Sequence, residues 1–171
     1  MTSTGDPTVR EALAADAARV AQVHVDAWRE TYSAVLADHH FSDAVLSRRR
    51  EFWAGYLSLA ERPGRMVVAE RGGVVVGFAN AGDAVGPDAE HGFPPVRPLQ
   101  LFSIYLLAAA HGSGLGQSML DAVIGDQPAQ LWVLQGNDRA IAFYRRNGFE
   151  SDGIEFIEPS DPRMIELRMV R

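Results

Sequence analysis

Cysteine is absent from all 171 residues of the chain. Disulfides, thiolate metal ligands and a cysteine nucleophile are therefore excluded together, and any covalent chemistry must use another group. No run of about 18 apolar residues, the length needed to span a bilayer, occurs either. The opening MTSTGDP has neither the basic flank nor the apolar centre of a secretory signal. These absences predict a cytoplasmic protein that does not interact with a membrane.

Positive charge is also in short supply. Lysine and arginine number 16 against 22 aspartates and glutamates, which gives a formal net charge of −6. A nucleic-acid partner is excluded, because neutralising phosphates requires a concentrated basic surface. The one basic run, Arg48 to Arg50, is short, and we interpret it as the solvated face of a helix. Five histidines with scattered spacing predict no metal site, and the pair His39-His40 is interpreted as surface or satisfied core.

Length and composition favour one compact globular domain. A chain of this length that is 47% hydrophobic and 22% charged can bury a substantial core. We therefore predict a single domain over residues 1–171, with residues 1–7 flexible.

The first half of the chain predicts a strand, two helices and a hairpin. Thr8–Leu13 is the predicted strand, and Asp16 is placed to cap a helix that runs towards Trp28 and Tyr32. A second helix follows Ser42-Asp43 and ends at Pro63-Gly64. Two β-branched runs around Gly72-Gly73 predict a hairpin with a two-residue turn. The apolar faces of the two helices are Val20, Val23 and Ala27, and Leu46, Trp53, Leu57 and Ala60.

The second half alternates strands and helices after a long loop over residues 84–97, which contains three prolines. Leu99–Ala109 has apolar residues on both of the faces that alternate along a strand, which predicts a strand buried on both sides. The remaining predicted elements are a helix over residues 116–125, a strand over Ala129–Leu134, a helix from Asn137 to Gly148 and a strand over residues 164–170. This order predicts an α/β (α+β) fold, a mixed sheet with helices on its faces.

The stretch HGSGLGQSML, residues 111–120, places three glycines between the buried strand and a helix. A helix N-terminus presents unpaired N–H groups and partial positive charge, so this arrangement predicts an anion site, with phosphate as the guest. An ordinary tight turn is the alternative. A P-loop is excluded because no lysine follows, and the dinucleotide fingerprint fails because Gln117 replaces its third glycine. Ser113 does not lie in a nucleophile elbow.

Two motifs together resemble the GCN5-related N-acetyltransferase (GNAT) family. The family's Q/R-x-x-G-x-G/A pattern after a central strand corresponds here to residues 111–116. Its asparagine, followed seven residues later by a tyrosine and then by a Gly-Phe pair, corresponds to Asn137, Tyr144 and Gly148-Phe149. The resemblance covers most of the chain. It implies a GNAT-like domain with a mixed, mostly antiparallel central sheet flanked by helices.

The resemblance also implies a cofactor and its contacts. Acetyl-CoA would be the co-substrate, with its pantetheine arm bonded to the backbone of the central strand and its pyrophosphate held by the glycine turn. Tyr144 would be the general acid that protonates the leaving thiolate, and Arg145 or Arg146 would contact the outer phosphate. The implied cofactor contacts are Ile104, Tyr105, Leu106, Gly112, Ser113, Gly114, Leu115, Gly116, Gln117 and Asn137.

The sequence departs from the family pattern at three positions. His111 replaces the usual glutamine or arginine, and Ala108 stands where many members have proline. Trp132 occupies the position of a glutamate that serves some members as general base. The base is therefore left open among His24, Glu30, His91 and a water relay. Without the motif, Tyr144 would be interpreted as a core aromatic beside Ile141.

Two functions follow from these residues. The first is an N-acetyltransferase in which a small-molecule or N-terminal primary amine attacks acetyl-CoA directly, a reaction that needs no enzyme nucleophile. The second is a catalytically idle acyl-CoA-binding sensor or interaction module. The resemblance places the acceptor beside Trp28, Tyr32 and the 84–97 loop, where Asp83, Asp88 and Glu90 could attract a cationic amine or be solvated loop charges. A homodimer is left open.

Overall fold

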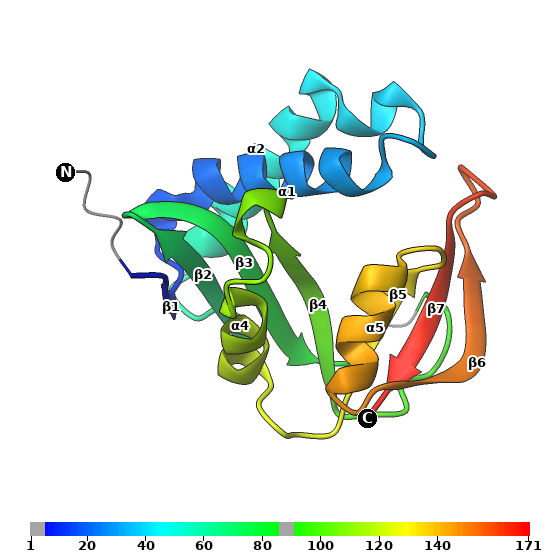
Figure 1. Ribbon diagram of the computed structural model, residues 1–171. Helices are drawn as coiled ribbons and strands as arrows, with labels where there is room; N and C mark the ends of the chain where they lie inside the picture. The colour runs from blue at the N-terminus through cyan, green and yellow to red at the C-terminus, as the bar shows by residue number, and fades with distance from the viewer. Residues whose placement is uncertain (1–5, 86–90) are drawn as a thin grey trace. The chain divides into compact units, whose positions relative to one another are not determined.

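The computed structural model describes residues 6–85 and 91–171 (Figure 1). The predicted flexible start lies mostly outside the described residues, as do Asp88 and Glu90. By its contacts the chain divides into two compact units. The first unit comprises Met1–Asn80 and Ser103–Val123, and the second comprises Ala81–Phe102 and Ile124–Arg171.

The first unit holds most of the helices. Its elements are β1 (Thr8–Glu11), the 3-10 helix η1 (Ala14–Asp16), α1 (Ala17–Tyr32), the 3-10 helix η2 (Asp38–Phe41), α2 (Asp43–Ser58), β2 (Arg65–Arg71), most of β3 (Val74–Asp83), the second half of β4 (Leu99–Leu106), the 3-10 helix η3 (Ala108–Ala110) and α4 (Leu115–Val123).

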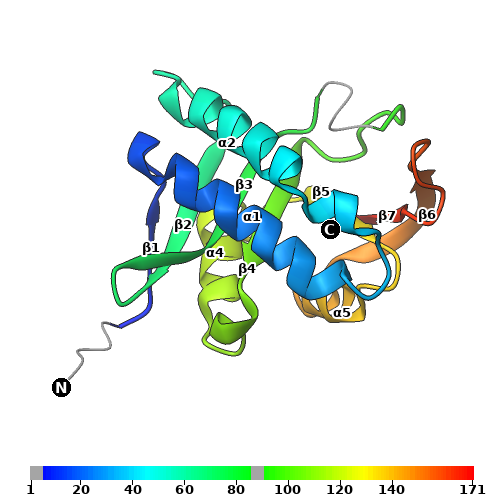
Figure 2. The same ribbon diagram turned by 90° about the horizontal axis from the view of Figure 1, so that it is seen from above.

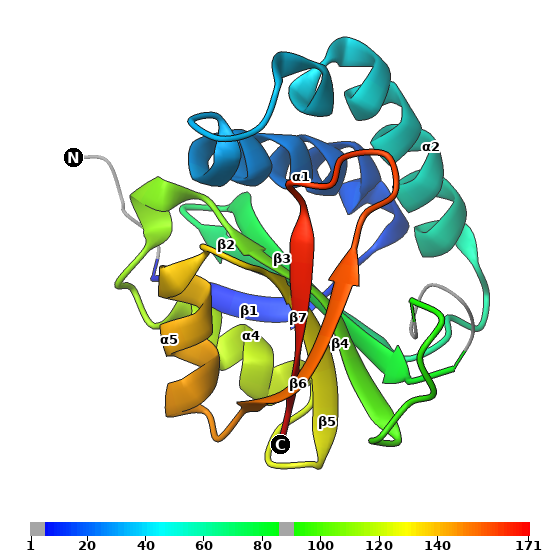
Figure 3. The same ribbon diagram turned by 90° about the vertical axis from the view of Figure 1, so that its right-hand side faces the viewer.

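The second unit holds the end of β3 and the first half of β4. It continues with β5 (Ala129–Leu134), α5 (Asp138–Arg146), β6 (Glu150–Ile157) and β7 (Ile165–Val170). Figure 3 shows β7 passing beside β6, and the two strands pair antiparallel.

The strand order of the sheet is β1-β2-β3-β4-β5-β7-β6. Neighbours pair antiparallel at β1/β2, β5/β7 and β6/β7, and parallel at β4/β5. The predicted α/β class with a mixed, mostly antiparallel sheet flanked by helices is confirmed. Among the described residues, none of the helices has the length and apolarity needed to cross a membrane.

In the first unit, α1 and α2 lie side by side (Figure 2) and bury a shared apolar surface against the strands. Val20 and Val23 of α1 meet Trp53 and Leu57 of α2 in a cluster that also contains Phe78 of β3. The predicted helical faces are therefore confirmed, except for Ala60, which lies beyond the end of α2 and is exposed. The predicted hairpin around Gly72-Gly73 is also confirmed.

Alternation along β3 places neighbouring residues on opposite faces of the sheet. Phe78 packs with α1 and α2, whereas Gly77 lies near Met119 of α4. A Cβ atom at position 77 would lie 2.7 Å from Leu106 Cδ1 and 2.8 Å from the Tyr105 carbonyl oxygen. Glycine is thus required here for β3 to approach the second half of β4.

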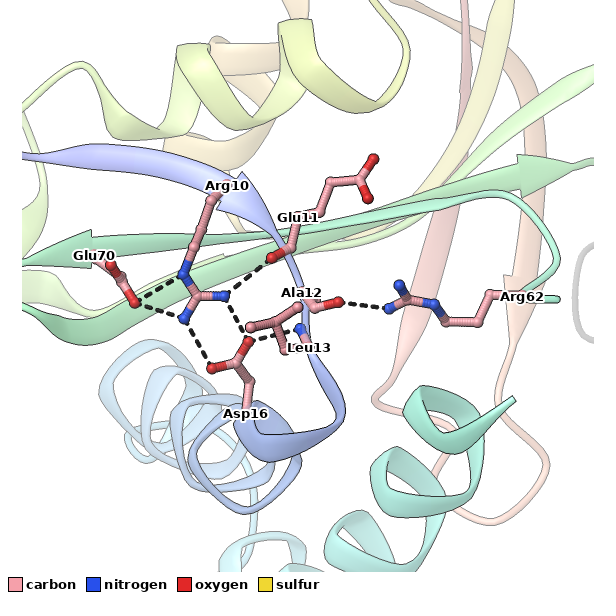
Figure 4. Close-up of polar contacts among 7 residues, drawn as sticks. All are labelled: Arg10, Glu11, Ala12, Leu13, Asp16, Arg62 and Glu70. Atoms are coloured by element: carbon pink, nitrogen blue, oxygen red, sulfur yellow. Dashed lines mark hydrogen bonds and ion pairs between the residues drawn. The ribbon is translucent and has the colours of Figure 1, made fainter. Parts of the chain in front are cut away.

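An ion-pair network joins β1 to η1 and β2 (Figure 4). The Arg10 guanidinium donates to both carboxylate oxygens of Asp16, at 2.7 and 2.9 Å, and to Glu70 at 2.6 Å. Asp16 also accepts the Leu13 N–H at 2.8 Å, and the Arg10 contact lowers the pKa of the Asp16 carboxyl. The predicted cap is therefore wrong in its bonding: Asp16 precedes α1, but its side chain caps no N–H of that helix.

Two predicted strands end early. The strand predicted for Thr8–Leu13 stops at Glu11, and the strand predicted for Leu99–Ala109 stops at Leu106, before η3. Burial on both sides of β4 is also wrong beyond Leu101, since Phe102 is 39% exposed and the following residues are half-buried. The parallel ladder with β5 covers Leu99 to Leu101, so the later residues lie beyond it.

Candidate cofactor site

The end of β4 is fixed by aromatic packing within the first unit. Tyr105 stacks on His24 of α1, with ring centroids 4.7 Å apart, and lies 5.5 Å from the Phe78 ring. Ile104, Tyr105 and Leu106 all lie beyond the ladder with β5. The side chain of Tyr105 thus holds the strand while its backbone departs from regular pairing with β5.

Two side chains hold the turn that follows β4. The Ala108 N–H donates to Glu30 Oε2 of α1 at 2.7 Å. His111 Nε2 lies 2.9 Å from the Leu106 carbonyl oxygen and donates to it, because a carbonyl can only accept. His111 therefore closes the turn from β4 back onto that strand.

The bond to Glu30 accounts for one departure from the family pattern. Proline has no N–H and suits the first position of a helix, whereas alanine at position 108 carries a donor there that needs a partner. Glu30 supplies the acceptor. From the sequence, Glu30 was considered only as a general base. The alanine in place of proline at position 108 was the signal that a backbone N–H there would need an acceptor.

The glycine turn has the backbone geometry that an anion site requires. Gly112 and Gly114 have φ angles of 76° and 84°, in the left-handed region that favours glycine, and both are exposed. A Cβ atom at either position would meet nothing within 4 Å. The Ser113 hydroxyl donates to the Ala110 carbonyl oxygen at 2.6 Å and so fixes the turn between them.

Helix α4 begins immediately after this turn. Its first backbone bond to the preceding turn runs from the Ser118 N–H to the Gly114 carbonyl oxygen at 3.0 Å, and its first turn carries no acidic residue. The N–H groups of Leu115, Gly116 and Gln117 precede that bond; the Leu115 N–H donates to the Ser113 hydroxyl oxygen at 3.4 Å, and the N–H groups of this first turn are directed towards the helix N-terminus. The macrodipole adds partial positive charge at the same end, so the segment favours an anion.

The second motif lies in the second unit. Asn137 precedes α5, and its side-chain oxygen accepts the Ala140 N–H at 3.2 Å, as predicted for a cap. Tyr144 is 7% exposed, with its ring 5.6 Å from Phe143 and 6.0 Å from Phe149. Gly148 ends the helix with a φ of 82°. Arg145 and Arg146 are exposed.

Three side chains were candidates for the general base, and each of them forms a hydrogen bond or an ion pair in the structure. His24 is buried, which lowers its pKa to about 3, and its Nδ1 accepts the Trp53 Nε1–H at 3.2 Å. The neutral ring therefore carries its proton on Nε2 and offers a donor there. Glu30 accepts from Ala108, and His91 lies 2.7 Å from a carboxylate oxygen of Glu166.

Trp132 stands in the place of the family's glutamate and lies within an aromatic cluster of the second unit. Its ring meets His91 edge-on at 4.8 Å, and the Arg168 guanidinium lies 5.8 Å from its centroid. Its surroundings are those of a packing residue.

Trp28 and Tyr32 form an edge-on pair at the end of α1, with ring centroids 5.1 Å apart. Both are half-buried, whereas Val20, Val23 and Ala27 of the same helix are buried. The Trp28 Nε1–H is buried without a hydrogen-bond partner in the part of the chain that the structure describes. Such a donor is costly unless something accepts from it.

A comparison with models of protein families matches residues 62–151 to the acetyltransferase (GNAT) domain, a segment that includes β4, the glycine turn, α4 and α5. The chain belongs to the GNAT family. It is thus an acetyltransferase, and the resemblance seen in the two motifs is confirmed. The roles of the individual site residues remain predictions.

Relatives of this GNAT chain include two curated bacterial proteins. A probable N-acetyltransferase of Mycobacterium tuberculosis is 28% identical over 152 residues, covering 86% of this chain and 82% of that protein. An uncharacterized N-acetyltransferase of Bacillus subtilis is 28% identical over 172 residues, covering 94% of this chain and 90% of that protein.

Solved GNAT structures share the fold. The PaiA N-acetyltransferase of Thermoplasma acidophilum, determined in complex with coenzyme A, superposes with a TM-score of 0.68 at 15% identity and covers 96% of this chain and 98% of its own. An acetyltransferase from Corynebacterium glutamicum, described as histone acetyltransferase HPA2 and related acetyltransferase, gives 0.68 at 25% identity, covering 97% and 96%.

The bond between Glu30 and Ala108 can be tested by a double-mutant cycle. Glu30→Ala should lower the free energy of unfolding by about 1 kcal/mol, the net value of one such bond. In an Ala108→Pro background the same change should cost almost nothing, because proline has no N–H. Leu107 already has φ −59° and ψ 144°, which suits a residue before proline. Urea unfolding of the four proteins measures the coupling, and equal costs in both backgrounds would contradict it.

Proposed function

We propose that the chain is an acetyl-CoA-dependent N-acetyltransferase that moves an acetyl group to a primary amine by direct attack. The observation that carries the proposal is the turn from β4 into α4, where left-handed Gly112 and Gly114 expose the backbone ahead of the helix N-terminus. The coenzyme A bound by the Thermoplasma acidophilum relative supports the choice of cofactor. Residues 1–171 would act as one N-acetyltransferase domain.

The proposed cofactor contacts follow the backbone. The pantetheine arm bonds the Ile104–Leu106 segment, which lies beyond the ladder with β5. The pyrophosphate lies against residues 112–117, where N–H groups and the helix dipole stabilise its charge without a basic side chain. Asn137 contacts the cofactor arm.

The reaction requires two proton transfers. The neutral amine attacks the thioester carbonyl carbon, the carbon–sulfur bond breaks, and the sulfur leaves as the CoA thiolate. Tyr144 gives its hydroxyl proton to that thiolate, a reasonable transfer because phenol and thiol have similar pKa values. The proton lost by the amine passes to water, since His24 Nδ1 already accepts from Trp53.

The acceptor lies beside Trp28 and Tyr32. Half-buried aromatic rings at the end of a helix offer apolar contact area, and the Trp28 Nε1–H adds a donor. Both contacts are available to an amine that carries further groups.

The first prediction of the proposal concerns the anion site. Gly114→Glu should abolish acetyl-CoA binding, because it places a side chain and a negative charge where the pyrophosphate would lie. The measurement is a thermal shift with acetyl-CoA, since a ligand at about 100 times its Kd adds roughly 2.7 kcal/mol of stability.

The matched control for this variant is Gly73→Glu. Gly73 belongs to the hairpin turn, has a φ of 75° and also has open space around an added Cβ. It therefore carries the same backbone strain and the same new charge away from the site. If both variants keep the shift, the phosphate-site assignment fails; if both lose it, backbone strain is the cause.

The second prediction concerns the acid. Tyr144→Phe keeps the buried ring and removes the proton, so kcat should fall by about 100-fold or more while acetyl-CoA affinity stays nearly constant. Tyr56→Phe is the control, because it removes a hydroxyl that donates to Pro63 elsewhere in the chain. Full activity of Tyr144→Phe would return Tyr144 to a packing role. A wild-type protein that binds acetyl-CoA but acetylates no amine would instead be a sensor.

A further inference from the structure

Arg49 is the middle residue of the basic run that the sequence places on a solvated helix face. That interpretation is confirmed for Arg48 and Arg50, which are exposed, and wrong for Arg49, which is half-buried. Arg49 lies one helical turn before Trp53, so both residues share the face of α2 that packs towards α1. Trp53 is 2% exposed and donates to His24 of α1.

No acidic side chain among residues 6–85 and 91–171 forms an ion pair with Arg49. Within the described residues Arg49 also forms no hydrogen bond, and burial lowers its pKa. The charged or titratable groups that act on it are the Tyr105 hydroxyl and the like charge of Arg48, and Arg49 in turn lowers the pKa of His24. A desolvated cation without a partner is costly.

The other arginines of the described chain show how unusual this is. Every other arginine that is buried or half-buried donates to a carboxylate or to a backbone carbonyl oxygen. These are Arg10, Arg19, Arg62, Arg97, Arg168 and Arg171.

A second donor without a partner lies close to the same histidine. Trp28 is one turn beyond His24 on α1, with ring centroids 6.5 Å apart, and its buried Nε1–H is unpartnered among the described residues. His24 adds an Nε2–H, because its Nδ1 accepts from Trp53. Arg49 and the Trp28 Nε1–H are therefore two donors near His24 that have no acceptor among the described residues, and Arg49 carries a full positive charge.

We propose that Arg49 and the Trp28 Nε1–H bind a carboxylate of the acceptor, so that the acceptor belongs to the amino-acid class. This inference rests on the proposed acetyl transfer to an amine. The planar guanidinium presents paired N–H groups that match the two oxygens of a carboxylate, and a charge-assisted bond of this kind is roughly twice as strong as a neutral one. An amine without a carboxylate, such as a polyamine, would leave the guanidinium unpaired and add a like charge.

The test compares free amino acids with their amides, which differ only in the carboxylate. Each standard amino acid and its amide is titrated calorimetrically into the protein, with and without saturating coenzyme A, and the acceptors that bind are then assayed with acetyl-CoA. The wild-type protein should bind at least one free amino acid more tightly than its amide. Binding of none, or equal binding of acid and amide, would overturn the inference.

Variants of Arg49 test whether this residue causes the tighter binding of the free amino acid. Arg49→Met should raise the Kd and KM of the acid by about 10- to 100-fold, the value of a charge-assisted bond, and leave those of the amide and of acetyl-CoA unchanged. Arg49→Lys, which keeps the charge but not the paired N–H groups, should lie between. Arg50→Met removes an exposed arginine of the same run and should change nothing.

The outcomes separate this inference from the proposed function. If Arg49→Met weakens acid and amide equally, Arg49 is structural and the inference fails while acetyl transfer stands. If the wild-type protein does not bind coenzyme A, acetyl transfer fails, and the titrations without coenzyme A still decide whether Arg49 recognises a carboxylate. Should Arg49→Met not fold, the comparison of Arg49→Lys with wild type decides the same question.

Discussion

A strand edge that loses its partner must satisfy its polar groups in another way, and this constraint shapes the β5-facing edge of β4 beyond Leu101 and the turn that leads to Ser118. The ladder between β4 and β5 ends at Leu101, and the helical ladder of α4 begins with Ser118. Between these points the Leu107 N–H bonds the Val76 carbonyl oxygen of β3, and the turn of η3 makes its own backbone bonds. Two side chains add to them: Glu30 accepts the Ala108 N–H, and His111 donates to the Leu106 carbonyl oxygen. An extended ligand with amides and phosphates would meet the bonding needs that remain.

The second constraint is electrostatic and lies among the side chains of α1 and α2. His24 is neutral at physiological pH because it is buried, and its Nδ1 is occupied by Trp53. His24 therefore contributes packing and a hydrogen bond between α1 and α2, and the proposed mechanism does not use it as the base. Around it, the half-buried Arg49 and the buried Trp28 Nε1–H favour a negatively charged group, although the chain as a whole is acidic. Local desolvation, and not net charge, decides which ligand such a site accepts.

Local patterns were sufficient to predict much of the fold and of the candidate site. The glycine turn before α4, the cap at Asn137 and the two-residue hairpin all depend on neighbours in sequence, and all were predicted. What escaped prediction depends on distant residues. Asp16 pairs with an arginine that also binds Glu70, and Arg49 is half-buried because α2 packs against α1.

Two further misses have compositional causes. Strand β6, Glu150–Ile157, was not predicted because its first four residues are polar or glycine and exposed, so that no apolar run or alternation marks its start. The C-terminal end of β4 was predicted too far along the chain, because the apolar run continues to Ala109, past the point where pairing with β5 stops. An apolar run shows that a segment avoids water, but not which surface covers it.

The central claim is that coenzyme A is held by the backbone between the end of β4 and the start of α4. The most direct measurement is a titration of the isotope-labelled protein with coenzyme A, in which amide chemical shifts are followed residue by residue. The account predicts that the largest changes fall on the amides of residues 104–106 and 112–117. Saturable binding that leaves these amides unchanged, and instead shifts signals elsewhere in the chain, would contradict it.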